Sequence, residues 1–120
     1  MTITRGDIVL VSLAFTSGTK GKIRPVLVVQ SDHNNRRLSS TIVAPITSNT
    51  SRVDHESTQF LVDITTPEGM ESGLRHHSAV LCENLATIDQ SRIGPRLGRL
   101  SPQAMCRIDT CLKAALGIAA

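Results

Sequence analysis

Hydrophobic positions along the chain fall into short runs separated by polar, turn-forming segments. Residues 7–13 (DIVLVSL) and 24–30 (RPVLVVQ) are rich in valine, leucine and isoleucine, and this composition predicts two strands. Residues 16–21 (TSGTKG) between them form a flexible loop by composition. Pro25 has no amide hydrogen to donate and suits the beginning of a strand, so we expect the second strand to start there.

Further strands are predicted at residues 41–46 (TIVAPI), about 59–64 and 78–82 (SAVLC), with a short one at 86–88. Residues 31–40 are polar, and the segments 47–51 and 65–69 have the composition of turns. A chain of 120 residues has room for one domain, which we take as residues 1–120. Five or six short strands in such a domain favour a strongly curved sheet or a small barrel.

The hydrophobic period changes near the C-terminus, where the pattern predicts a helix. Ser101 is a suitable N-cap, Pro102 suits the first helical position, and Gly117 supplies a stop. Between them lies an apolar stripe at helical spacing, made of Met105, Ile108, Leu112 and Ala115. This stripe either packs on the sheet or forms a dimer contact, and we favour packing.

The charge balance makes a polyanionic partner plausible. The formal net charge is +3, and all but three of the thirteen basic residues are arginines, whose planar guanidinium matches phosphate oxygens two at a time. The chain has no tryptophan or tyrosine and two phenylalanines, so it lacks the row of aromatic platforms on which single-strand binders stack bases.

Neither a metal site nor a membrane segment is predicted. Cys82, Cys106 and Cys111 show no C-x-x-C spacing and no nearby histidine pair, so we expect them to be small buried hydrophobes. No apolar run approaches the roughly 18 residues that cross a bilayer, and we expect a cytoplasmic protein.

Two strand ends carry candidate chemistry. Arg24 precedes Pro25, which biases Arg24 toward extended backbone and restricts where its side chain can point. Thr47 and Ser48 follow the strand at 41–46, so hydroxyl groups stand where a strand meets a loop. On composition alone, the simpler interpretation of Arg24 is a solvated cation at the end of a strand, and that of Thr47 and Ser48 is an ordinary turn.

Four blocks of sequence resemble the MazF/PemK toxin family in order and spacing. They are GDIVLV (6–11), RPVLVV (24–29), VAPITSN (43–49) and SAVLCEN (78–84). Thr87-Ile88-Asp89, Ile93 and the GRLSP block (98–102) also look like the family's closing strand and C-terminal helix. The resemblance covers nearly the whole chain.

This resemblance implies a mainly β fold, an SH3-like small barrel with a C-terminal helix, assembled as a homodimer. It also implies a metal-independent, cofactor-free endoribonuclease that cleaves single-stranded messenger RNA at short sequences and is restrained by an acidic antitoxin. Arg24 and Thr47 match the residues that the family uses for catalysis. Some relatives carry an acid where Glu83 stands, which makes Glu83 our candidate proton acceptor.

The chemistry suits these residue types. In RNA the substrate's own 2′-hydroxyl can attack the phosphorus, so the protein needs no nucleophile. A guanidinium is always protonated and cannot be the base, but its paired donors suit phosphoryl oxygens. Histidine is the usual base, and His33, His55, His76 and His77 all lie in or beside polar loops, where solvent exposure is the simpler interpretation.

Groups around these residues are candidates for binding the substrate: Ser17, Lys20, Lys22, His33, Ser48, Asn49 and Asn84. Residues 17–23 differ from the glycine-rich, Glu-containing loop of many relatives, and Leu81 stands where one branch has arginine. Because loop groups read bases while Arg24 and Thr47 address the backbone, these departures affect the cleavage sequence more than the activity.

Two alternatives remain open from the sequence. A gyrase-binding toxin of the CcdB type shares the fold, but that branch uses a functional tryptophan and this chain has none. A catalytically silent nucleic-acid-binding module would keep the basic groove and tolerate the loss of Thr47. RNA cleavage in excess EDTA separates both from the ribonuclease.

Overall fold

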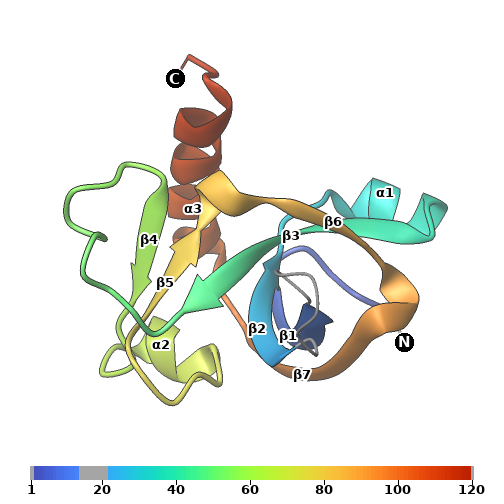
Figure 1. Ribbon diagram of the computed structural model, residues 1–120, viewed down its shortest axis with the longest axis horizontal. Coiled ribbons are helices and arrows are strands. Elements are labelled where there is room, and N and C mark those ends of the chain that lie inside the picture. Colours follow the sequence, from blue (N-terminus) through green and yellow to red (C-terminus); the bar gives the residue numbers. More distant parts are fainter. Residues whose placement is uncertain (1, 14–21, 120) are drawn as a thin grey trace.

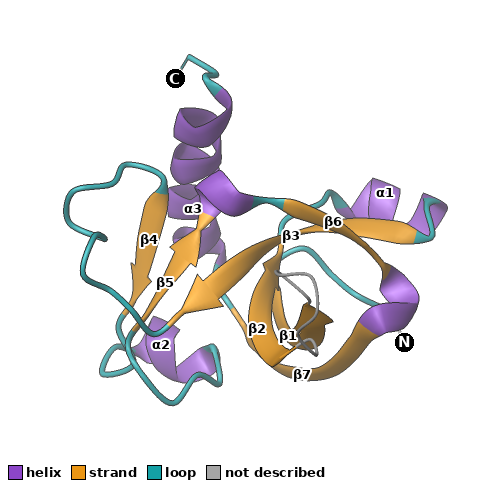
Figure 2. Ribbon diagram, in the orientation of Figure 1, coloured by secondary structure: helices purple, strands orange, loops and turns teal. Residues whose placement is uncertain are grey.

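The structure is a computed structural model that describes residues 2–13 and 22–119, and its strands form one curved antiparallel sheet with α3 packed against it (Figures 1 and 2). The strands are β1 (Asp7–Leu13), β2 (Lys22–Val28), β3 (Ser40–Thr47), β4 (Gln59–Val62), β5 (Ser78–Leu81), β6 (Ala86–Asp89) and β7 (Ile93–Arg99). The helices are α1 (Asp32–Arg37), α2 (Pro67–Glu71) and α3 (Pro102–Leu116), with 3-10 turns η1 (Cys82–Asn84) and η2 (Gln90–Arg92).

Strands β1, β2 and β3 lie in the middle of the sheet and bury side chains on both faces. The strand order is β4-β5-β3-β2-β1-β7, and β6 pairs with β3. Neighbouring residues such as Ile8 and Val9, or Leu27 and Val28, belong to two different core clusters because successive side chains on a strand point to opposite faces. Burial on both faces explains why these strands are continuous apolar runs rather than alternating ones.

One of the two cores lies inside a small barrel. β1, β2 and β3 curve round it, β7 closes against β1, and β6 closes against β3 (Figure 1). Its buried members are Ile3, Val9, Val11, Val26, Val28, Val43 and Ile88. This arrangement confirms the small barrel expected from the pattern of short strands.

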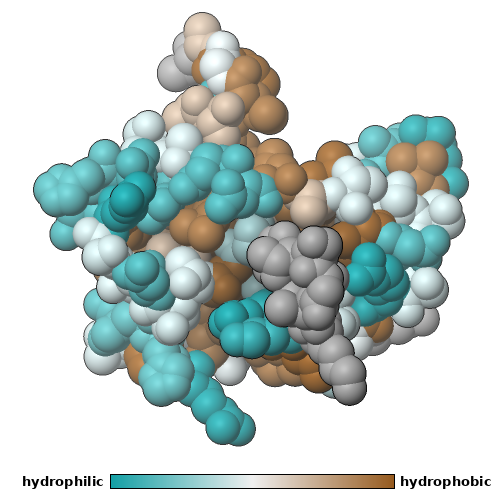
Figure 3. Space-filling view, viewed as in Figure 1, coloured by the Kyte–Doolittle hydropathy of each residue, from teal (hydrophilic) through white to brown (hydrophobic). Residues whose placement is uncertain are grey.

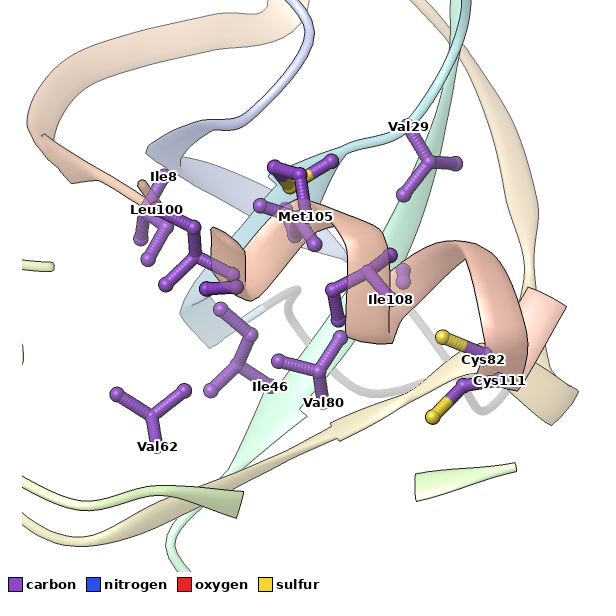
Figure 4. Packing of buried hydrophobic residues seen from close by; sticks show 13 residues of the cluster. Ile8, Val29, Ile46, Val62, Val80, Cys82, Leu100, Met105, Ile108 and Cys111 are labelled. Carbon is purple, nitrogen blue, oxygen red and sulfur yellow. The ribbon is translucent and has the colours of Figure 1, made fainter. Parts of the chain in front are cut away.

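The other core lies between the sheet and α3. Ser101 caps the helix by accepting a hydrogen bond from the Ala104 amide, and Gly117 ends it with φ 71°. Met105 and Ile108 point from α3 toward the strands (Figure 4), which confirms that the apolar stripe packs on the sheet. Farther along, the space-filling view shows hydrophobic residues at the end of α3 (Figure 3), where Leu116 and Ile118 are 60% and 55% exposed.

Four elements depart from the predictions made on the residue pattern. β2 begins at Lys22 and pairs with β1 from there, so Pro25 lies inside the strand and not, as was expected, at its start. The polar segment 31–40 contains α1, and the predicted turn at 65–69 overlaps α2, whose cap is Thr66. β7 contains Gly94, Pro95 and Gly98 and does not have the composition of a strand; its pairing with β1 is interrupted by two register shifts. β1 and the barrel core thus hold a strand in place that local propensity does not favour.

The cysteines divide into two environments. Cys82 in η1 and Cys111 on α3 are buried, as expected, and lie side by side (Figure 4). Burial, with smaller contributions from Cys111 and Glu83, raises the pKa of the Cys82 thiol to about 12, so Cys82 is not a thiolate nucleophile at neutral pH. Cys106 is exposed, so the prediction that it is buried was wrong; it lies on the outer face of α3.

Within residues 2–13 and 22–119, no helix has the length and apolar composition that a membrane span requires. The same residues hold no group of three or more metal-ligating side chains that could bind a metal ion.

Candidate active site

The ladder between β2 and β3 ends just before Arg24 and Thr47. The last paired residues at this end are Val26 and Pro45. Pro25 and Pro45 have no amide hydrogen, so neither can donate a ladder hydrogen bond at this point. On its other edge β3 pairs with β5 at Ile46 and Thr47, so the sheet opens only on the β2 side.

Arg24 and Thr47 face each other across this opening. Continuing the β2–β3 register by two residues places them opposite one another, and opposed residues of an antiparallel pair project to the same side. Both side chains line one cavity of about 220 Å³, together with Pro45, Ile46, Leu81 and Asn84. The structure therefore brings Arg24 of β2 and Thr47 of β3 together at one cavity.

The Thr47 hydroxyl is oriented by its own loop. Thr47 Oγ1 accepts a hydrogen bond from the Asn49 amide at 3.1 Å, and Asn49 Oδ1 in turn accepts one from the Ser51 amide at 3.1 Å. A hydroxyl oxygen that accepts one bond still has a hydrogen to donate. Thr47 is thus suited to donate to an anionic oxygen in the cleft.

A second cavity, of about 350 Å³, adjoins the first. Arg24 and Ile46 line both, so these two residues stand between the cavities. The other lining residues are Leu10, Pro25, Ser48, Gly73, Leu74, Arg75, His76, Ser78 and Leu97. The two cavities together form a groove with apolar walls and a rim of arginine and hydroxyl groups, a surface that suits a phosphodiester flanked by bases.

The remaining substrate-binding candidates are dispersed. Ser48 and Asn84 line the groove, and Asn49 supports Thr47, but Lys22 lines neither cavity. His33 lies in α1, which follows the end of β2 opposite to Arg24, and lines neither cavity. Ser17 and Lys20, which were also predicted to bind the substrate, lie outside the residues that the structure describes.

The Glu83 carboxylate is hydrogen-bonded to two residues outside the groove. Thr58 Oγ1 donates to Glu83 Oε1 at 3.0 Å and Gln59 Nε2 donates to Glu83 Oε2 at 2.8 Å. Desolvation raises the pKa of this carboxyl, but hydrogen bonds from Gln59, its own backbone and Thr58 together outweigh it and lower the pKa below its ordinary value. Glu83 lines neither cavity. Its role as proton acceptor stays a prediction that this geometry does not support.

These hydrogen bonds predict a pH-dependent contribution of Glu83 to stability. Since the folded pKa lies below the unfolded one, the stabilisation is present at neutral pH and is lost as the pH falls through the ordinary range of glutamate, about 4.3, toward the folded pKa. We expect Glu83→Gln to reduce the free energy of unfolding at pH 7 and to reduce it less at pH 3. Urea denaturation at both pH values measures this, and equal losses would contradict it.

Sequence reasoning did not place Arg75 and His76 in the site. They belong to the loop between α2 and β5, and their side chains line the second cavity beside Arg24. The pair of histidines directly before β5 indicated only a polar strand end. Which loop packs beside Arg24 depends on the closure of the barrel, which no local pattern reveals.

Comparisons with known proteins show the family of the chain and solved structures with a similar fold. The family model of "PemK-like, MazF-like toxin of type II toxin-antitoxin system" matches residues 4–116. A solved endoribonuclease in complex with its cognate antitoxin, from a mycobacterial species, is 21% identical with a TM-score of 0.79, over 98% of both chains.

Two further solved structures have the same fold. The toxin MazF-mt6 of Mycobacterium tuberculosis is 25% identical with a TM-score of 0.75, over 95% of this chain and 99% of that one. A MazE–MazF structure from Deinococcus radiodurans matches at 21% identity and a TM-score of 0.73, over 99% of this chain and 100% of the other.

Proposed function

This chain belongs to the family of PemK-like and MazF-like toxins of type II toxin–antitoxin systems, and from that premise we propose that it is a metal-independent endoribonuclease acting on single-stranded RNA. The observation that carries the proposal is the shared cleft of Arg24 and Thr47. Solved structures with the same fold include two endoribonucleases from mycobacterial species, which supports this activity.

The reaction we propose uses the substrate as its own nucleophile. The ribose 2′-oxygen attacks the adjacent phosphorus, the bond from phosphorus to the 5′-oxygen breaks, and the products are a 2′,3′-cyclic phosphate and a 5′-hydroxyl. Arg24 donates to the phosphoryl oxygens, whose negative charge grows in the transition state. Thr47 donates to the same phosphate and holds it in register with the attacking oxygen.

We further propose that the toxin works as a homodimer in the cytoplasm, where its RNA substrate is found, and that an acidic antitoxin inhibits it. The exposed Leu116 and Ile118 at the end of α3 supply apolar surface that suits a dimer contact. Solved relatives in complex with their antitoxins support a protein inhibitor. The groove rim, with Arg24 and Arg75, suits an acidic segment as well as RNA.

Cleavage in the presence of a chelator tests the proposed function. Purified protein is incubated with a long unstructured RNA in excess EDTA, and new ends are labelled with polynucleotide kinase without prior phosphatase, which detects 5′-hydroxyls. We expect discrete cuts at a short recurring sequence. An RNA with a 2′-deoxy residue at a mapped site is expected to bind and resist cutting, whereas cutting of this RNA would overturn the mechanism. Binding of RNA without any cutting would instead favour the silent binding module.

A further inference from the structure

The proposed reaction needs a group that accepts the 2′-hydroxyl proton, and the groove offers one in an unexpected place. Among the described residues that line the two cavities, the ionisable side chains are Arg24, Arg75 and His76. Both guanidiniums are permanently protonated. Among the described lining residues, His76 is therefore the one whose side chain can act as a general base.

The other candidate bases are engaged or absent from the groove. Glu83 is hydrogen-bonded to Thr58 and Gln59. His77 Nδ1 accepts a hydrogen bond from the Ile64 amide at 3.2 Å and lies 3.4 Å from Asp63 Oδ1, which directs this ring toward the end of β4. His33 and His55 line neither cavity.

The loop that carries His76 is held against β7 by two glycines. A Cβ added to Gly73 would lie 2.1 Å from the Leu97 carbonyl oxygen, and one added to Gly98 would lie 2.2 Å from the Glu71 carbonyl oxygen. The two backbones are thus in direct contact. On the other side of His76, Ser78 Oγ donates to the His76 carbonyl at 2.9 Å and fixes the chain where it enters β5.

The electrostatic surroundings fit an acceptor of this kind. Arg24 reaches the second cavity from β2, and Arg75 lines it from the same loop as His76. The lining residues from β1, β3 and β7 are uncharged, and no carboxylate lines the cavity among the residues described. When RNA is bound, its phosphate offsets the repulsion between an imidazolium at His76 and the two guanidiniums, and no carboxylate among the lining residues described competes for the RNA backbone.

We propose that His76 is a catalytic residue that accepts the 2′-hydroxyl proton, an assignment that rests on the proposed ribonuclease function. As the bond from the 2′-oxygen to phosphorus forms, the proton moves from that oxygen to the neutral imidazole. The bond from phosphorus to the 5′-oxygen breaks, and that oxygen takes a proton from solvent. The imidazolium then returns its proton to solvent, so no water is consumed and no redox change occurs.

The main test compares His76→Gln with His77→Gln, two neutral substitutions at adjacent histidines. Positioned proton transfer contributes about 10²–10⁴-fold to rate, so His76→Gln is expected to lower kcat by about 10²-fold or more while binding of a 2′-deoxy RNA is unchanged. In the wild type kcat is expected to rise with pH as an imidazole loses its proton, and this rise is expected to vanish in His76→Gln. The His77→Gln enzyme is expected to keep both the rate and the pH profile.

Each outcome has a distinct meaning. If His76→Gln cuts at the wild-type rate with the wild-type pH profile, the proposal for His76 is overturned while the ribonuclease function stands. Restored cutting of the His76→Ala variant by added imidazole would support the proposal. If the wild type cuts no RNA in EDTA, the ribonuclease function fails and the role of His76 fails with it.

A sulfur-substituted substrate distinguishes proton acceptance from proton donation. Replacing the bridging 5′-oxygen with sulfur gives a leaving group that needs no protonation. If His76 accepts the 2′ proton, the defect of His76→Gln persists on this substrate. If the defect disappears, His76 protonates the leaving group instead and the assignment as acceptor is wrong.

Discussion

Arg24→Ala is expected to lower the rate of RNA cleavage by about 10²–10³-fold, the usual cost of removing one well-placed donor to a developing negative charge. Arg24 lines both cavities and is the one cationic residue that does so, within the part of the chain that the structure describes. The loss is expected mainly in kcat because the charge on the phosphoryl oxygens grows in the transition state. Single-turnover cleavage of a short RNA containing one mapped site measures it.

A control variant that removes a different arginine separates stabilisation of the transition state by Arg24 from general attraction between a cation and RNA. Arg37 in α1 is exposed, donates to Asn34 Oδ1 at 2.9 Å and lies beyond the opposite end of β2. Arg37→Ala removes the same charge and is expected to leave kcat unchanged. If both variants lose activity equally, and the loss disappears at saturating RNA, Arg24 contributes only to binding.

The double variant of Arg24 and Thr47 tests whether the two side chains act on one phosphate. Groups that act as a unit are strongly non-additive, so the rate loss of the double variant is expected to fall well short of the product of the two single losses. If the rate loss of the double variant equals the product of the two single losses, Arg24 and Thr47 act at separate places, although they line the same cavity.

The parts of the fold that followed from the sequence are those in which one local pattern agrees with tertiary packing. α3 has a cap, an N-terminal proline, a stripe and a glycine stop, and all four act as expected. The central strands were predictable because burial on both faces leaves no polar residue to interrupt the run. β7 was not predictable from its residues, because its position depends on β1 and on backbone contacts at Gly98.

The residues of the candidate active site also divide into those that the sequence predicted and those that it did not. Arg24 and Thr47 were placed by blocks of sequence adjacent to buried strands, and the barrel brings those strand ends together. Glu83 lies in η1, which directly follows β5, and the direction of its side chain is set by hydrogen bonds from Thr58 and Gln59, just before and at the start of β4. The position of His76 depends on how the loop before β5 packs on β7. Contacts between segments distant in sequence leave no periodic pattern to detect.

Gly73→Ala is expected to destabilise the protein and to reduce cleavage, since Gly73 positions the loop that bears Arg75 and His76. Its φ of 74° is costly for any residue with a Cβ, and that Cβ would meet the Leu97 backbone at 2.1 Å. Backbone strain of about 1–2 kcal/mol and overpacking of about 1–3 kcal/mol predict a total loss of about 2–5 kcal/mol. Urea denaturation measures the loss in stability.

Gly117→Ala is the matched control, because Gly117 has nearly the same backbone conformation with φ 71° and nothing within 4 Å of an added Cβ. It is expected to cost only the strain, about 1–2 kcal/mol. The difference between the two variants then measures the contact between the His76 loop and β7. Equal losses in stability would mean that the contact with Leu97 relaxes without cost. In that case the loop is not held by β7, and another constraint must fix the position of His76 beside Arg24.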